Sequence, residues 1–368
     1  MLQERMTVLL PPVITLLGVS FAFSNTSFSL TDVAIVFAAG LVFIDWFRKH
    51  DWYWPLHRKD QRVALYFAAI IVLGIIFLPF DDIAFGLITL YLVGVYFVAR
   101  YATHLGYRST ILKLYTVGAF FSALYGITWW LWVHEVGERY RFFFDDPNVY
   151  GAFLVPATLF FMWRVLAKDT MVGYRTLNLL GASVLYSALL LTLSRGAWLQ
   201  AGISLGIVLL IMFFTKQFDR ASYKVLGSGV VVILIGGLLM SGTLTEHMLK
   251  RQSNSDYHRI ENYSYALETI SQFSTHRFIV GYGNGSYEQF SIDAFAAHNT
   301  YIRLLFENGF LGLGLFGFLI VGAVFKNRRE FHKPDIAILL ASLAGILVHG
   351  LFIDTLHWRH LWLILGLL

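Results

Sequence analysis

The sequence predicts an all-α membrane protein, a polytopic bundle of transmembrane helices, and its composition carries this prediction. Of its 368 residues, 57% are hydrophobic and only 14% are charged, whereas about 25% of the residues in a soluble domain are charged. So few charges cannot keep the surface of a soluble protein of this length hydrated, which excludes a soluble enzyme. The 17% of aromatic residues and the mean hydropathy of +0.63 exclude disorder.

The apolar runs predict the number of spans. A helix that crosses the hydrocarbon core needs about 20 mostly apolar residues. Eleven runs meet this length, and a twelfth from Leu361 has eight residues. This last run is either the start of a span that further residues complete or a half-helix at the membrane interface. The eleven runs begin near Thr7, Leu30, Val63, Ile83, Ile111, Val149, Thr176, Gly196, Val225, Asn299 and Ile336.

The basic residues predict the orientation, because Lys and Arg are enriched in cytoplasmic connections. Alternate connections and the N-terminus together hold 19 of the 28 Lys and Arg residues, so we place this side in the cytoplasm. The opposite side then has one long loop, which is where a site facing water has room to form. The predicted parts are N-terminal transmembrane helices (1–133), central transmembrane helices with a hinge at Arg195 (134–241), the outer loop (242–298) and C-terminal transmembrane helices with the incomplete last span (299–368).

Residues 257–273 of the outer loop show helical periodicity. Ile260, Tyr263, Leu267 and Ile270 recur at helical spacing with charges between them. This pattern predicts an amphipathic helix that lies on the membrane surface. A glycine-rich turn, Gly281-Tyr-Gly-Asn-Gly285, follows and is by itself a weak phosphate-loop signal.

Arg195 is the first candidate for function, because charges beside membrane spans are costly. It lies in Ser194-Arg195-Gly-Ala-Trp-Leu199, at a hinge with almost no loop between two spans, on the predicted outer side. The alternative is an arginine that snorkels to lipid headgroups. The short hinge holds Arg195 against the bundle and favours a functional role.

Arg259 and His298 are the candidates of the outer loop. The Arg259 guanidinium is a fork of donors suited to phosphate oxygens, although a surface salt bridge with Glu261 or Asp256 explains it equally well. His298 and Asn299 stand where the loop ends and a span begins. Histidine moves protons near neutral pH, but at a helix entrance it is more often a cap or an interfacial group.

Further charges fall on the same side. Arg303 and Glu307 continue into the next span as a pair that either serves a site or locks the helix to its neighbours. Asp354 and Arg359 return to the outer face near the C-terminus, and the two histidines beside them lack other obvious ligands, so we predict no metal site. Two arginines, a candidate base and a carboxylate on one side indicate a substrate with phosphates and a hydroxyl group to activate.

Four segments between Arg141 and Gly309 carry a family resemblance in their order and spacing. They are Phe144-Asp-Asp146-Pro147-Asn148-Val-Tyr-Gly151, the Arg-x-x-x-Leu element at Arg195 to Leu199, Arg259 with Tyr265-Ala-Leu267 and the glycine turn, and His298-Asn299-Thr-Tyr-Ile-Arg-Leu-Leu-Phe-Glu307-Asn-Gly309. They resemble the motifs of the O-antigen ligases and related polysaccharide polymerases of bacterial envelopes. The N-terminal third agrees with this family only in hydropathy.

The resemblance implies a GT-C-like glycosyltransferase of the bacterial inner membrane, with a periplasmic active site and an undecaprenyl-diphosphate-linked glycan as donor. It assigns diphosphate contacts to Arg195 and Arg259 and activation of the acceptor hydroxyl to His298, with inversion. Two guanidiniums can neutralise a diphosphate leaving group, so neither a metal nor a cofactor is expected. Its partners are the donor, the acceptor and membrane lipids, and not nucleic acid. The candidates for substrate binding are Asp146, Asn148, Asn299, Arg303, Glu307, Asp354 and Arg359.

Other functions remain open at this point. A ligase transfers the glycan to lipid A–core, whereas a polymerase joins it to another lipid-linked repeat unit. The two share the motifs, and the defining activity of the family favours the ligase. A polysaccharide transporter or flippase typically has discontinuous helices, paired midplane charges and repeated halves, and the sequence indicates none of these. A structural membrane partner is a further alternative.

Overall fold

The computed structural model describes residues 30–48, 62, 65–69, 72, 83–133, 140–141, 144, 146–228, 259–290 and 296–368. The regular structure of these residues is helical and contains no strands, which confirms the predicted all-α class. The helices are α2 (Leu30–Arg48), α5 (Ile83–His104), α6 (Arg108–Val133), α7 (Pro147–Leu166), α8 (Val172–Leu191), α9 (Arg195–Phe214), α11 (Thr275–Val280), α12 (Tyr287–Phe290), α13 (Thr300–Asn327), α14 (Pro334–His349) and α15 (Arg359–Leu367), with further helical segments at 220–228 and 259–271.

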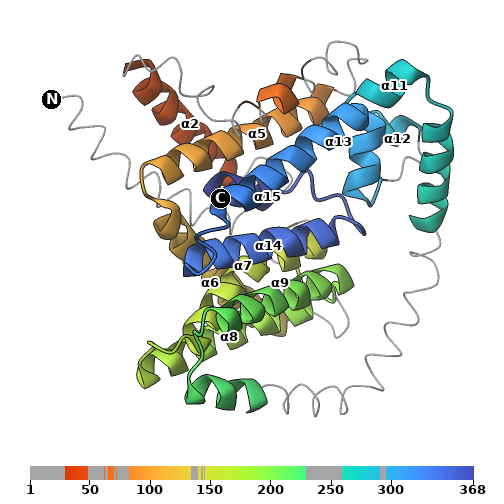
Figure 1. Ribbon diagram of the computed structural model, residues 1–368. Helices are drawn as coiled ribbons and strands as arrows, with labels where there is room; N and C mark the ends of the chain where they lie inside the picture. Colours follow the sequence, from red (N-terminus) through yellow and green to blue (C-terminus); the bar gives the residue numbers. More distant parts are fainter. Residues whose placement is uncertain are drawn as a thin grey trace.

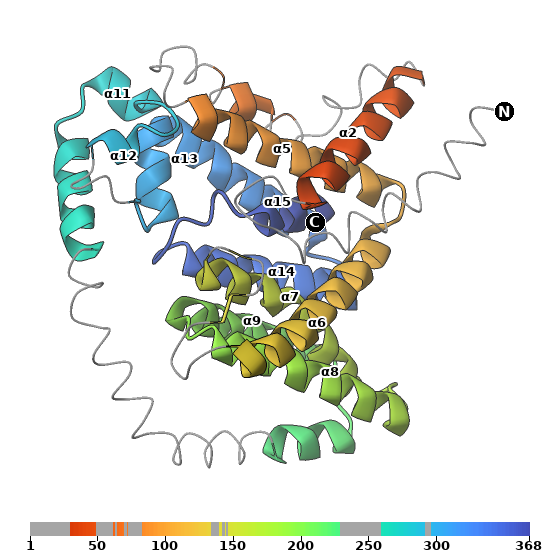
Figure 2. The same ribbon diagram turned by 180° about the vertical axis from the view of Figure 1, so that it is seen from behind.

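The long helices pack side by side in one bundle (Figures 1 and 2). Helix α14 lies against α9 and α7, α8 packs on α7, and α15 packs on α5. One apolar core runs through these helices from α2 to α15. The short helices α11 and α12 lie beside one end of α13 (Figure 1), so the outer-loop segment covers that end.

Four of the described helices are long and apolar enough to cross a membrane, which supports the predicted multi-pass protein. Helices α2 and α5 begin at the predicted Leu30 and Ile83, and the later ones begin within a few residues of the predicted starts. The run near Thr7 and most of those near Val63 and Val225 lie outside the described residues, so the count of eleven spans stays a prediction. The four spans are Arg108–Trp129, Pro147–Leu166, Arg195–Phe214 and Thr300–Asn327.

Helix α15 forms from the last apolar run and is 9 residues long; both expectations for this run stay predictions. Its residues from His360 to Leu367 are buried in the bundle. Gly366 lies so close to the backbone of Tyr96 on α5 that a side chain would overlap it. The Leu367 carbonyl accepts a hydrogen bond from Nε of Arg108 at 2.6 Å. Because its apolar side chains are buried and its last carbonyls accept hydrogen bonds from other helices, this short helix is stable inside the bundle.

The predicted amphipathic helix of the outer loop is present at 259–271, and its place on the membrane surface stays a prediction. Ala266 and Ile270 are buried against Tyr287 and Phe306, whereas Ile260 is 65% exposed. Leu267 is 54% exposed as well. Exposed apolar side chains of this kind are available to a membrane surface, as the expectation requires. The small side chain of Ala266 allows the helix to approach the aromatic cluster closely, and the helix packs on protein along that face.

Helix α13 is interrupted at Gly309, where φ is 65° and ψ is −170°. A regular helix would bond the carbonyls of Phe306 and Glu307 to amides four residues later. The interruption leaves these carbonyls available, and they accept hydrogen bonds from the amides of Tyr282 at 3.1 Å and Gly283 at 2.8 Å. The glycine turn of the outer loop is thereby fixed to the break. The sequence indicated no discontinuous helix, and that expectation was wrong.

Two glycines make this docking possible. An added Cβ on Gly309 would overlap the backbone carbonyl of Ile279, and one on Gly281 would overlap the carbonyl of Glu307. Both glycines also have positive φ values, which L side chains avoid. The two motif glycines therefore face each other across one backbone-to-backbone contact.

We predict that Gly309→Ala destabilises the protein. The backbone conformation of Gly309 is one that only glycine normally adopts, and it costs an alanine about 1–3 kcal/mol. The added methyl group also displaces the turn at Ile279. Gly314→Ala is the matched control on the same helix, because nothing lies within 4 Å of its added Cβ; alanine there stabilises a helix by about 0.5–1 kcal/mol. Thermal unfolding of the purified protein measures both. Equal midpoints for the two variants would contradict the docking described here.

Candidate active site

The first part of the site is the junction of α7 with α9. Asp146 caps α7 by accepting a hydrogen bond from the amide of Asn148 at 2.7 Å, and Ser194 caps α9 by accepting from the amide of Ala197. The Ser194 hydroxyl also donates to Oδ1 of Asn148 at 2.7 Å. Two of the predicted motifs therefore meet at their helix caps, and they place Arg195, the exposed first residue of α9, beside the start of α7.

The second part is the start of α13. Asn299 caps this helix, since its Oδ1 accepts hydrogen bonds from the amides of Tyr301 at 2.9 Å and Ile302 at 3.0 Å. Its Nδ2 donates to the Leu351 carbonyl at 3.1 Å. Every polar atom of this amide group is thus used by the protein backbone. Asn299, predicted to bind substrate, here fixes the position of the residue before it, His298.

Helix α14 connects these two parts. Gly196, next to Arg195, touches the ring of His349 so closely that a side chain would overlap it. Nδ1 of His349 lies 2.8 Å from Oε1 of Gln200 on α9. One residue further, the Gly350 carbonyl accepts a hydrogen bond from the amide of Thr300 at 2.8 Å. The start of α9 and the start of α13 are therefore joined through the end of α14.

His298 is half-buried and stands between charges of both signs. Burial lowers its pKa below the ordinary 6.5, and the positive charge of Arg259 lowers it further. The carboxylates of Asp146 and Asp354 oppose this shift, and Arg303 adds to it. The predicted base thus lies within electrostatic reach of residues from α7, the outer loop, α13 and the C-terminal segment. A lowered pKa keeps the imidazole neutral at pH 7, as a proton acceptor requires.

Arg259 is the first residue of the helix at 259–271 and is half-buried. Its charge acts on His298 and on Tyr263. Among the residues that the structure describes, it forms no ion pair. The predicted alternative partner Asp256 lies outside the described residues.

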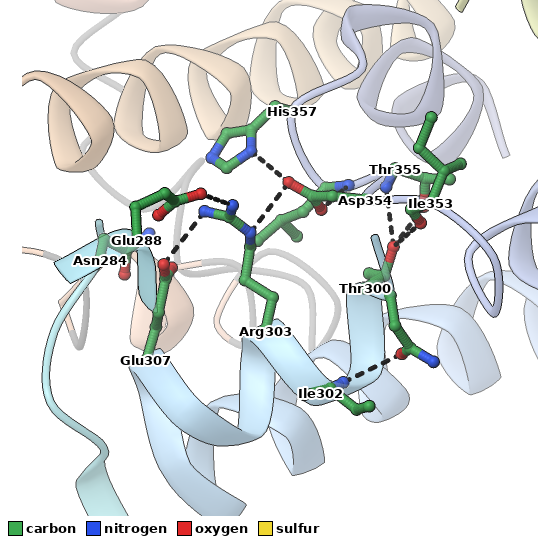
Figure 3. A network of polar contacts seen from close by, with 12 residues as sticks. Asn284, Glu288, Thr300, Ile302, Arg303, Glu307, Ile353, Asp354, Thr355 and His357 are labelled. Atoms are coloured by element: carbon green, nitrogen blue, oxygen red, sulfur yellow. Dashed lines mark hydrogen bonds and ion pairs between the residues drawn. The ribbon is translucent and has the colours of Figure 1, made fainter. Parts of the chain in front are cut away.

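Arg303 lies at the centre of a buried charge network (Figure 3). Its side chain is 2% exposed, and its guanidinium forms ion pairs with Glu307 at 3.1 Å, with Asp354 at 3.1 Å and with Glu288. Nδ1 of His357 lies 2.6 Å from Oδ2 of Asp354. Burial by itself raises the pKa of the Asp354 carboxyl, but the charges of His357 and Arg303 outweigh it and hold this pKa well below its usual range. Asp354 is therefore ionised.

A chain of neutral polar side chains extends this network to α5. Asn308 donates to Oδ1 of Asn284 at 2.5 Å, and Nδ2 of Asn284 donates to Oγ1 of Thr89 at 2.9 Å. The Thr89 hydroxyl lies 3.4 Å from Nε2 of His357. The N-terminal helices thus reach the site, although the N-terminal third carried no motif.

Arg359 lies at the edge of the site and pairs with α2. Its Nε donates to Oδ1 of Asp32 at 2.9 Å and its Nη2 to Oδ2 at 3.1 Å. The Tyr91 hydroxyl donates to the same carboxylate at 2.6 Å. These bonds tie the start of α15 to α2 and α5. They give Arg359 a structural partner, so the assignment of this residue to substrate binding stays a prediction.

The comparison with known families covers the middle of the chain. Residues 180–317 match the family model described as O-antigen ligase. This segment is O-antigen ligase-like. The match spans less than half of the chain, and no curated protein matches the chain. It supports an O-antigen ligase or polymerase type of function, a glycosyltransferase-like enzyme that uses lipid-linked glycans.

The O-antigen ligase-like segment contains Arg195, Arg259 and His298, together with the charge pair of Arg303 and Glu307. Asn299 also lies within it, whereas four predicted site residues lie outside it: Asp146, Asn148, Asp354 and Arg359. The structure nevertheless brings Asn148 to Ser194 and Asp354 to Arg303. The site is therefore assembled from the matched segment and from flanking helices.

Sequence reasoning missed Thr89, Asn284, Glu288 and His357 as members of the network. Asn284 lies within the glycine turn, so the turn did carry a usable signal. Thr89 carried no such signal, because a threonine within an apolar run is common in membrane helices. Its partner Asn284 is 195 residues away in sequence and is brought beside it only by the fold.

We predict that Arg303→Gln destabilises the fold by about 3–5 kcal/mol, because it leaves buried carboxylates without their counter-charge. Arg328→Gln is the control, since Arg328 is exposed and lies over the ring of Phe325; a surface change of this kind costs at most about 0.5 kcal/mol. Denaturant unfolding in detergent measures the difference. If Arg303→Gln lowers the free energy of unfolding no more than the control does, the network is not an essential part of the fold.

Proposed function

We propose that this protein is an O-antigen ligase of the bacterial inner membrane, with its active site on the periplasmic side. It transfers a glycan from undecaprenyl diphosphate to a hydroxyl group of lipid A–core. The observation that carries this proposal is the half-buried His298 beside Arg259, within the O-antigen ligase-like segment. A base held neutral by burial and by a neighbouring guanidinium suits a reaction in which a hydroxyl attacks next to a diphosphate.

The helix ends of the site support binding of an anion. The starts of α7, α9 and α13 meet here through their caps and through α14. Each helix N-terminus carries a partial positive charge from its dipole, which favours phosphate. The first amides of α13 are already bonded to Gly350 and Asn299, so α13 contributes through its dipole. Arg195 adds a full charge at the start of α9, and Arg259 adds a second one from the outer loop. The proposed diphosphate site therefore combines two guanidiniums with helix dipoles.

The proposed reaction follows from these groups. His298 accepts the proton of the acceptor hydroxyl as its oxygen attacks the anomeric carbon, from the face opposite the diphosphate. A new glycosidic C–O bond forms, and the C–O bond to the diphosphate breaks with inversion. The electron pair leaves with undecaprenyl diphosphate, whose charge Arg195 and Arg259 stabilise. Because these side chains supply the positive charge, we expect the reaction to proceed in the presence of a chelator.

We predict that Arg195→Ala, Arg259→Ala and His298→Ala each lower kcat by at least about 100-fold, the usual cost of losing a charge stabiliser or a base. The assay uses purified lipid-linked donor and lipid A–core, with chelator present. Arg277→Ala is the control from the same loop. Its guanidinium lies 4.6 Å from the ring centre of Tyr282 and donates to the Gly281 carbonyl at 3.3 Å, so its contacts stay within the loop and the variant should retain activity.

The products of this assay separate the alternatives. Glycan joined to lipid A–core identifies a ligase, whereas longer lipid-linked chains identify a polymerase. Movement of intact donor across a vesicle membrane without a new glycosidic bond would identify a transporter. Retention of transfer by all three alanine variants, each folded normally, would refute the catalytic assignment.

The pH dependence gives a second prediction. His298 must be neutral to accept a proton, so kcat falls as the pH drops through its pKa, which lies below about 6.5. Arg259→Gln removes a positive charge, raises this pKa and moves the acid limb to higher pH. Asp146→Asn removes a negative charge and moves the limb to lower pH, while asparagine still caps α7. The measurement is kcat at saturating donor as a function of pH, and the midpoint of its fall at acidic pH reports the pKa. Shifts of the same sign in both variants would contradict the assignment.

A further inference from the structure

Tyr263 connects the two halves of the proposed site. It lies one helical turn after Arg259, on the helix at 259–271. Its hydroxyl donates to the backbone carbonyl of His298 at 2.5 Å, across 35 residues of sequence. The helix that carries the proposed phosphate ligand is therefore bonded directly to the residue that carries the proposed base.

The backbone at His298 needs to be held. Its φ of 47° lies in the left-handed region, which costs a residue other than glycine about 1–2 kcal/mol. Such conformations persist only where their surroundings fix them. On one side Asn299 is fixed as the cap of α13, and on the other the Tyr263 hydroxyl holds the His298 carbonyl.

A shared acceptor strengthens this arrangement. The Leu351 carbonyl accepts a hydrogen bond from Nδ2 of Asn299 at 3.1 Å and lies 3.4 Å from the Tyr263 hydroxyl. Three segments thus meet at His298: the outer-loop helix, the start of α13 and the connection after α14. Burial also raises the pKa of Tyr263, so its hydroxyl stays protonated and able to donate.

We propose that Tyr263 is a positioning residue, whose hydroxyl sets the separation and orientation of His298 relative to Arg259. This inference rests on the proposed function, because it concerns the geometry between the base and the phosphate ligand. Tyr263 bonds to the backbone and not to substrate. Since a displacement of a catalytic group by about 1 Å can cost about 100-fold in rate, losing this bond affects catalysis more than stability.

The test is Tyr263→Phe, which removes one hydroxyl group and keeps the ring. We expect kcat to fall by about 10-fold to 100-fold, with a much smaller change in KM for the donor. Tyr301→Phe is the matched control, because the Tyr301 hydroxyl donates to the Leu347 carbonyl at 2.6 Å but has no bond to His298. This control removes an equivalent tyrosine–carbonyl bond and should keep kcat within about 2-fold of the parent.

A readout independent of activity is the reaction of His298 with diethylpyrocarbonate, followed by mass spectrometry as a function of pH. The reagent modifies neutral imidazole, so its rate profile reports the pKa of His298, and the exposed His276 and His332 serve as internal references. In Tyr263→Phe, His298 is released from its buried position beside Arg259. We therefore expect faster modification and a profile midpoint that moves up toward about 6.5.

The outcomes separate the two proposals. A Tyr263→Phe variant with parental kcat and a parental modification profile overturns the positioning role. The same holds if Tyr301→Phe reproduces both effects, because the effects would then reflect general loss of packing. If the protein transfers no glycan, the proposed function fails, and if transfer proves independent of His298, the catalytic assignment of His298 fails. In both cases the modification profile still decides whether Tyr263 holds this histidine in place.

Discussion

The end of the bundle that holds the candidate site depends on the ion pairs of the buried Arg303 guanidinium. A charge in such surroundings is stable only when it is paired and hydrogen-bonded. Its partners come from α12, from α13 itself and from the connection after α14. These segments therefore have to meet around one side chain. The start of α13 is held in this way, and the proposed base lies five residues before Arg303, at that start.

The break in α13 is the second constraint, and it supports the first. Gly309 ends the outer part of the helix and exposes two carbonyls, which bind the glycine turn of the outer loop. The glycine turn contains Asn284, which belongs to the polar network. Helix α12 follows the turn and carries Glu288, an ion-pair partner of Arg303. The loop is thus fixed by backbone hydrogen bonds on one side and by charge on the other. Tyr263 then connects the preceding helix of the same loop to His298.

Several features of this site could be read from the chain because they are local. The spacing of Arg303 and Glu307 places both on one helical face, and the two side chains do pair. The periodicity of residues 257–273 predicted a helix, which is present at 259–271. Ala266 and Ile270 pack on the aromatic cluster, whereas Ile260 and Leu267 remain exposed and available to a membrane surface. Periodicity specifies a helix, while the choice of buried face depends on the shape of its partner.

The sequence by itself determined that the chain is a helical membrane protein and where most of its described helices begin. It also determined which charged residues are candidates for the site. These properties follow from apolar run length and from the cost of placing charge near lipid, and both act along the chain. The tertiary structure alone decided that Arg359 pairs with Asp32, that Asn284 reaches Thr89, and that Tyr263 holds His298. Such contacts join residues far apart in sequence, and no local preference encodes them. They arise only when the helix ends meet on one side of the bundle.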